Sequence, residues 1–277
     1  ERIPSKDNFK NTVFDLCFRP DGTQVLIAVG NRILVYDAND GDLLHSLKGH
    51  RDYVYACAYS RDGKRFASGG ADKTIIIWTS KCEGILKYSH NDSIQCLSYN
   101  PVTQQLASAT QSDFGLWSPE QKSVQKFKVA AKVLSMSWTN DGQYLALGQI
   151  NGHISIRDKQ GNEKVRIERN APIWCLQWSP PTPDKVDILA VGCWDQTLSF
   201  YLLSGAQQNK DRTLAYDPCS LSYYVDGEYI VMGGSDRKIS MYTKDGVFLK
   251  VVAEREDWIW AVKSRPKAKF VCVGCND

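Results

Sequence analysis

The 277-residue sequence lacks any run of 18 apolar residues, and its first six residues lack the apolar core of a signal peptide. The first absence excludes a membrane-spanning helix, and the second removes any indication of secretion. Charge imbalance is also small, because 34 Lys and Arg residues face 31 Asp and Glu residues. A net charge of +3 is too weak to indicate a nucleic-acid partner.

The sequence also begins without a Met, and its nine cysteines form an odd number that does not suit a disulfide framework. Several cysteines alternate with apolar residues, as Cys57 does within residues 55–59, and this pattern is typical of buried thiols. We therefore expect part of a longer protein that resides in a reducing compartment.

What the sequence does contain is a repeat with a period of about 40 residues. Asp-Gly turns begin at Asp21, Asp62, Asp141 and Asp226. Short β-rich runs end in an aromatic residue at Tyr36, Trp78, Trp117, Tyr201 and Tyr242. A tight turn with Asn or Asp recurs at Asn31, Asp72, Asp113, Asn151, Asp195, Asp236 and Asp277. Because three independent series share one period, chance is a poor explanation.

Each period has the layout of four short antiparallel strands, which residues 54–88 illustrate. An apolar strand at 54–59, a turn at 60–63 and a second strand at 65–68 precede a β-branched third strand at 74–78 and a fourth at 84–88. Four strands every 40 residues is the period of a propeller blade. Residues 120–128 are the best candidate for a helix, but they lie where a fourth strand is expected. The pattern therefore predicts an all-β fold.

The first strands of the blades begin near residues 13, 54, 94, 133, 173, 218 and 259. This spacing predicts a seven-bladed β-propeller over residues 13–277, preceded by a lead-in over residues 1–12. The seventh blade reaches only Asp277, the turn position before a third strand. Since a closed ring leaves no exposed sheet edge, we expect six blades and an incomplete seventh from a longer chain.

The second period resembles the consensus of the WD-repeat family closely, in Gly49-His50, in residues 67–72 and in Ile77-Trp78. In that family one His, one Ser, one Asp and one Trp form a hydrogen-bonded chain within each blade. The resemblance implies that this tetrad is His50, Ser68, Asp72 and Trp78. A buried polar group persists only with partners, which agrees with a linked set of this kind.

The third period carries the same four residue types with altered spacing. The resemblance assigns them to His90, Ser108, Asp113 and Trp117. The turn that leads to Asp113 is one residue longer than in the second period, and the interval from Asp113 to Trp117 is shorter. The other periods keep only pieces of the tetrad, such as Asp195 and Asp236.

The repetition also argues against catalysis, and we predict no catalytic, cofactor-binding or metal-binding residues. Asp72 and Asp236 recur where a turn requires them. Residues 69–74 lack the Gly-Lys-Ser/Thr ending of a phosphate loop. Cys272 and Cys275 have the spacing of a zinc pair, but no second pair or His cluster stands nearby.

The resemblance to WD propellers further implies a partner-binding face around the central channel. In the family, the residues at the mouth of the first strand and just before the turn Asp point to this face. In this sequence these positions hold Phe14, Tyr55, Trp174, Trp194 and Trp260, and Trp258 lies two residues before Trp260. Since aromatic residues dominate interface hot spots, we predict that this set contacts a protein partner.

Three stretches outside the WD consensus, residues 78–92, 113–124 and 138–148, resemble the WD-repeat subunits of intraflagellar transport complex A. The resemblance implies a scaffold without enzymatic activity that supports retrograde transport in cilia, cilium assembly and ciliary import of membrane receptors. It implies contacts with other complex A subunits and a tubby-like adaptor, and indirectly with dynein-2 and ciliary membrane cargo. The expected locations are the cilium and its base, the cytoplasm and the cytoskeleton.

Two other interpretations remain open from the residues alone. One is a coat-like propeller that binds lipid or ubiquitin, for which the alternating Lys263, Arg265, Lys267 and Lys269 offer a basic segment on a predicted solvated turn. The other is a propeller hydrolase, which requires acids or His residues that converge at the channel mouth.

Overall fold

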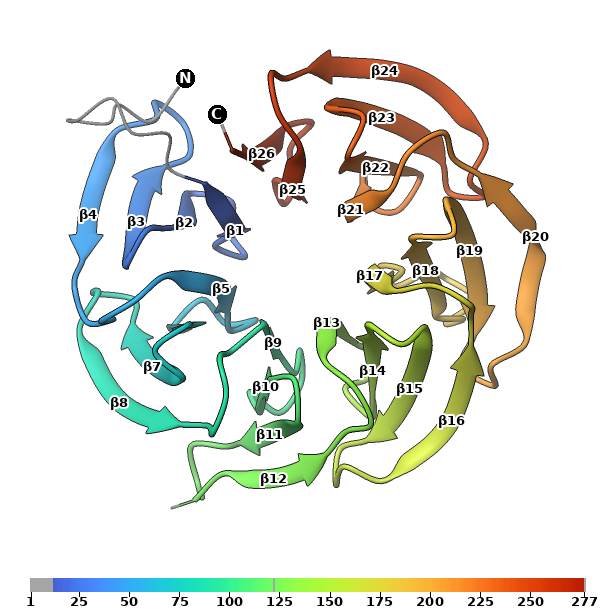
Figure 1. The fold of residues 1–277 in the computed structure, drawn as a ribbon. Coiled ribbons are helices and arrows are strands. Elements are labelled where there is room, and N and C mark those ends of the chain that lie inside the picture. Colours follow the sequence, from blue (N-terminus) through green and yellow to red (C-terminus); the bar gives the residue numbers. More distant parts are fainter. Residues whose placement is uncertain (1–11, 122, 277) are drawn as a thin grey trace.

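The computed structural model describes residues 12–121 and 123–276. In this part the chain forms 26 strands in seven antiparallel sheets, which follow one another around a central axis (Figure 1). Six sheets have four strands and the last has two. The predicted all-β propeller with an incomplete seventh blade is therefore confirmed. The predicted lead-in over residues 1–12, apart from Thr12, and the turn residue Asp277 lie outside the described residues.

The two inner strands of each blade lie nearest the axis (Figure 1). The first strands are β1 (Val13–Phe18), β5 (Val54–Tyr59), β9 (Cys96–Tyr99), β13 (Val133–Trp138), β17 (Ile173–Trp178), β21 (Pro218–Tyr224) and β25 (Ile259–Ser264). The second strands are β2 (Gln24–Val29), β6 (Arg65–Gly70), β10 (Leu106–Ala109), β14 (Tyr144–Gln149), β18 (Ile188–Cys193), β22 (Tyr229–Gly234) and β26 (Val271–Cys275).

The two outer strands complete blades one to six. The third strands are β3 (Arg32–Asp37), β7 (Thr74–Thr79), β11 (Asp113–Trp117), β15 (His153–Asp158), β19 (Thr197–Leu202) and β23 (Lys238–Thr243). The fourth strands are β4 (Leu43–Leu47), β8 (Gly84–Ser89), β12 (Gln125–Lys128), β16 (Glu163–Glu168), β20 (Gln207–Thr213) and β24 (Phe248–Glu254). The helix candidate at residues 120–128 thus contains β12, a fourth strand, as the repeat predicts.

The first strand of blade three begins later than the sequence predicts. β9 starts at Cys96, two residues after the predicted Ile94. The backbone N–H of Ile94 donates to the carbonyl of Gly70 in the preceding blade, at 3.0 Å. Ile94 therefore links two blades before the ladder of its own blade begins.

The core lies between neighbouring blades, because each sheet packs its faces against the next one. Ile33 and Leu26 of blade one meet Phe66 and Trp78 of blade two in one buried cluster. Fully burying a side chain of this size contributes about 1.5–3 kcal/mol. The fourth strands are mostly exposed, as in β8 and β20, because they form the outer rim.

Hydrogen bonds near the axis also connect the blades. Side chains of one first strand accept a backbone N–H from the first strand that follows. The pairs are Cys57 to Asp15 Oδ2 (3.1 Å), Trp178 to Ser137 Oγ (3.1 Å), Tyr223 to Gln177 Oε1 (3.2 Å) and Ser264 to Ser222 Oγ (3.0 Å). Each bond keeps a polar side chain of the inner strands satisfied and fixes the spacing of two blades.

Blade seven closes onto blade one through Arg265. Its guanidinium donates to the carbonyls of Gly22 (2.8 Å) and Ala38 (2.9 Å) and to the side chain of Asn39. The interpretation of Lys263 and Arg265 as residues of a solvated turn is therefore wrong. Both belong to or directly follow β25 and are half-buried in the ring, because their strand packs against β1. In the part of the chain that the structure describes, no helix is long and apolar enough to cross a membrane.

Candidate partner-binding face

The tetrad residues of blade two lie in one hydrogen-bonded chain. Trp78 Nε1 donates to Ser68 Oγ at 2.9 Å, and Ser68 Oγ lies 2.8 Å from His50 Nε2. His50 Nδ1 lies 3.0 Å from Asp72 Oδ2. The four residues come from three places in the chain, namely the loop before β5, the hairpin of β6 and β7, and the end of β7. Ser68, Asp72 and Trp78 come together because β6 and β7 form one hairpin, and the loop before β5 places His50 beside them.

One proton arrangement satisfies every member of this chain. Burial lowers the pKa of His50 below its ordinary value, against the opposing effect of Asp72, so the ring is neutral at neutral pH. Because Ser68 already accepts from Trp78, its hydroxyl donates to His50 Nε2, and His50 Nδ1–H donates to Asp72. Burial disfavours ionisation of Asp72, but donation from the backbone N–H of Arg51 and from His50 outweighs it and lowers its pKa.

Blade three joins three of its four predicted residues. His90 Nδ1 lies 2.8 Å from Asp113 Oδ1, and His90 Nε2 lies 2.8 Å from Ser108 Oγ. Among the described residues, no hydrogen bond joins Trp117 to Ser108. The hydroxyl of Tyr88 on β8 donates to Ser108 instead, at 3.3 Å.

Other blades replace the tetrad with different chemistry that the sequence pattern did not predict. In blade five, Arg169 takes the place of the His and donates to Asp195 (2.6 Å), to Thr197 (2.8 Å) and to the Tyr201 hydroxyl (3.1 Å). It also binds Asp211 at 2.9 Å. The available signal was Arg169 itself, which stands before the fifth first strand as His50 stands before the second.

The four predicted tryptophans of the last three blades lie together, and we call them the tryptophan patch. Trp174 and Trp194 stack with ring centroids 4.1 Å apart and planes 5° apart. Trp258 and Trp260 lie 5.4 Å apart. The two pairs meet through Trp174 and Trp260 at 6.1 Å and through Trp194 and Trp258 at 6.5 Å. All four residues are partly exposed.

Blade six makes room for this patch. Figure 1 shows β17, β21 and β25 as neighbours around the axis. The second position of β21 holds the small, buried Cys219, whereas the same position holds Trp174 in β17 and Trp260 in β25. The two large rings therefore meet across the strand between them. Trp194 Nε1 donates to the carbonyl of Pro218 at 3.0 Å, which anchors the patch to β21.

The other two predicted residues form a separate aromatic group at blades one and two. The Phe14 and Tyr55 rings lie 5.0 Å apart in an edge-to-face arrangement. Tyr53, which the sequence analysis did not select, adds a third ring 6.0 Å from Phe14 and is 54% exposed. Its position, one residue before β5, corresponds to that of Trp258 before β25, and this correspondence could have identified it.

The sequence pattern did not predict that Asp15 and Lys263 lie near each other close to the axis. Asp15 is half-buried on β1, and burial raises its pKa despite the nearby ammonium of Lys263 on β25 and hydrogen bonds from two backbone N–H groups. Both side chains come from first strands, and the partners of Asp15 include the backbone of blade two. Their chemistry is therefore tied to holding blades seven, one and two together.

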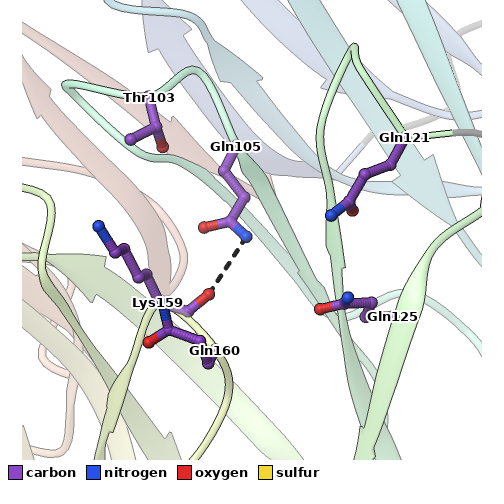
Figure 2. Close-up of a pocket in the computed structure, with 6 residues that line it drawn as sticks. All are labelled: Thr103, Gln105, Gln121, Gln125, Lys159 and Gln160. Carbon is purple, nitrogen blue, oxygen red and sulfur yellow. Dashed lines mark hydrogen bonds between the residues drawn. The ribbon is translucent and has the colours of Figure 1, made fainter.

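A hollow of about 260 Å³ between blades three and four is lined by amide side chains, Thr103 and Lys159 (Figure 2). Gln105 donates to the carbonyl of Lys159 at 3.3 Å across it (Figure 2). Within residues 12–121 and 123–276, no three His, Cys, Asp or Glu side chains gather as a metal site.

Comparison with known proteins shows the family to which the chain belongs. Residues 12–277 match the family model described as the IFT122 first beta-propeller. The chain is similar to intraflagellar transport protein 122 homologs of Mus musculus (60% identity, 98% of this chain), Xenopus tropicalis (58%, 100%) and Homo sapiens (49%, 98%). It spans 23%, 24% and 27% of those proteins, respectively. The chain belongs to the family of first β-propellers of intraflagellar transport protein 122.

Proposed function

We propose that this chain is a non-catalytic scaffold propeller of a subunit of intraflagellar transport complex A, and that it works by holding other proteins. Family membership supports a role in intraflagellar transport. The tryptophan patch carries the proposal of a contact surface, because it gathers four partly exposed tryptophans in mutual ring contact. Exposed apolar patches of this kind mark interaction sites, and Trp is enriched in hot spots.

The proposed partners are the other subunits of complex A and a tubby-like adaptor. Dynein-2 and ciliary membrane cargo are reached indirectly through them. The proposed roles are retrograde transport, cilium assembly and import of membrane receptors, at the cilium and its base and in the cytoplasm and cytoskeleton. The polar residues of the blades support a scaffold role, because the tetrads and the Arg169 network use their hydrogen-bonding groups within the blades.

The test replaces Trp174 and Trp260 with Ala in the full-length protein and measures recovery of complex A subunits from ciliated cells. We expect subunit or adaptor recovery to fall by about tenfold or more, because a truncated hot spot costs about 2 kcal/mol. Normal assembly and normal cargo delivery by a folded double variant would refute the assignment of this face.

The matched control replaces Val102 and Val186 with Ala. These side chains are 61% and 43% exposed, and they lie in loops between first and second strands, on the opposite face of the ring. Their removal exposes no new cavity, so recovery is expected to stay at the wild-type level. An equal loss in the control would mean that the assay reports general instability.

A further inference from the structure

Two of the four indole N–H groups of the tryptophan patch already donate hydrogen bonds within the protein. Trp194 Nε1 donates to the carbonyl of Pro218, and Trp260 Nε1 donates to Asn276 Oδ1 at 3.0 Å. The face of an indole ring carries negative electrostatic potential and attracts cations. The four rings lie in contact at blades five and seven, where Trp174 and Trp194 cover one face of each other.

Carboxylates border the same rings. Asp257 directly precedes Trp258, and its Oδ1 accepts the backbone N–H of Trp258 at 2.7 Å. Asp217 precedes Pro218, the residue to which Trp194 is anchored, and its side chain lies 3.4 Å from Gln196 Nε2. Both residues are partly exposed, so they place negative charge beside residues that contact the patch.

Lys263, on the same strand as Trp260, lies near the carboxylate of Asp15 on β1. Three arginines of this region are also engaged by other groups or lie away from the patch. Arg169 is bound by the carboxylates of Asp195 and Asp211 at 2.6 and 2.9 Å. Arg237 and Arg255 are joined by a backbone hydrogen bond beside the paired strands β23 and β24, which are the outer two strands of blade six. They therefore lie away from the axis, whereas the patch lies on the inner strands.

We infer that the tryptophan patch binds a cationic side chain, Arg or Lys, carried by an extended segment of a protein partner. The inference rests on the proposed function, since it specifies the chemistry of the partner at that face. The cation contacts indole faces while Asp217 and Asp257 supply the opposite charge. An anionic segment is repelled by both features, and a purely apolar segment leaves the negative charge of the two carboxylates uncompensated.

The test measures binding of fluorescently labelled 12-residue peptides to the full-length protein by anisotropy at low salt. One peptide alternates Arg and Gly, a second has citrulline in place of Arg, and a third has Glu. Citrulline keeps the planar shape and removes the charge. We expect the Arg peptide to bind about tenfold more tightly than the citrulline peptide, and the Glu peptide to bind least. Equal binding of the Arg and citrulline peptides would overturn the inference.

Two variant sets separate the contributions. Trp174→Leu with Trp258→Leu keeps an apolar side chain at each position but removes the ring faces, and we expect it to weaken Arg-peptide binding about tenfold. Trp174→Phe with Trp258→Phe should restore part of that loss, since Phe keeps a weaker aromatic face.

Asp217→Asn with Asp257→Asn keeps the shape of both side chains and should reduce the salt dependence of binding. The matched control is Phe14→Leu with Tyr55→Leu, which removes the aromatic pair at the same strand position of blades one and two. If this control loses as much Arg-peptide binding as the tryptophan variants, the patch is not the site.

The outcomes also separate this inference from the proposed function. If Trp174→Ala with Trp260→Ala abolishes complex assembly while the Arg and citrulline peptides bind alike, the face binds partners and the cation inference is wrong. If the Arg peptide binds selectively while assembly is normal, the cation site stands and the scaffold assignment of this face is wrong.

Discussion

Replacing Ser68 with Ala tests the physical basis of the blade-two tetrad. The Ser68 hydroxyl is fully buried, and it donates to His50 Nε2 at 2.8 Å while it accepts from Trp78 Nε1 at 2.9 Å. His50 and Trp78 are only 7% and 6% exposed, so water does not readily replace the lost hydroxyl. The Ala variant therefore leaves one buried acceptor and one buried donor without a partner.

The expected cost follows from these two groups. An orphaned buried polar group costs about 1–3 kcal/mol, so the two groups orphaned by Ser68→Ala should together cost about 2–6 kcal/mol in local stability. Ser108→Ala in blade three should cost less. Its bond to His90 is equally short, but its second bond, from Tyr88, is long at 3.3 Å. The order of the two losses of stability therefore tests the reasoning as well as the size of either loss does.

Amide hydrogen exchange of the full-length protein, followed by mass spectrometry, reports the local stability of each blade. A loss of 2 kcal/mol corresponds to exchange about thirtyfold faster, which we expect in peptides covering β6 and β7. The control is Ser89→Ala, an exposed serine at the end of β8.

The reasoning fails if Ser68→Ala speeds exchange in β6 and β7 by less than about threefold. It also fails if Ser108→Ala has the larger effect, because the long Tyr88 contact would then outweigh the short Trp78 contact.

Three further perturbations follow from the same structure. The pKa of His50 in the folded state is below its ordinary value of about 6.5, so the unfolded chain binds a proton at a higher pH than the folded chain does. Protection of β6 and β7 against amide exchange, corrected for intrinsic exchange, should therefore be full above pH 6.5 and decline as the pH falls toward 5. A flat profile would contradict the neutral ring. Arg265→Leu should cost about 1–3 kcal/mol and speed exchange in β1 and β25, since it leaves the carbonyls of Gly22 and Ala38 unpaired; Arg265→Lys should not rescue it, because one ammonium cannot span three acceptors. Gly49→Ala should lower the thermal midpoint, because a Cβ there would lie 2.9 Å from Ile76 and 3.1 Å from Trp78; an unchanged midpoint would mean that both side chains shift freely.

Much of this protein follows from local sequence pattern. The repeat of turns and β-rich runs predicts four-stranded blades, because each hairpin forms between neighbouring segments and needs no knowledge of the rest. The tetrad of His50, Ser68, Asp72 and Trp78 spans fewer than 30 residues, so its assembly follows from one blade alone. The selection of tryptophans at equivalent strand positions rests on the same periodicity.

Other features depend on how the blades meet. Arg265 reaches Gly22 and Asn39, which are more than 220 residues earlier, and only closure of the ring brings these residues together. For this reason the prediction of a solvated turn is wrong for Lys263 and Arg265, whereas Lys267 and Lys269 are exposed in the turn after β25. In blade three, Tyr88 rather than Trp117 serves Ser108, a choice made by side-chain packing that the spacing does not encode.

The tryptophan patch combines both kinds of information. The sequence alone identifies Trp174 and Trp260 as residues at equivalent positions of two blades. The tertiary structure decides that they meet, because the intervening strand carries the small Cys219 and leaves the space above it to its neighbours. Periodicity thus determines which face a residue occupies, whereas contact between blades depends on the volumes of side chains that are distant in the chain and adjacent only in the closed ring.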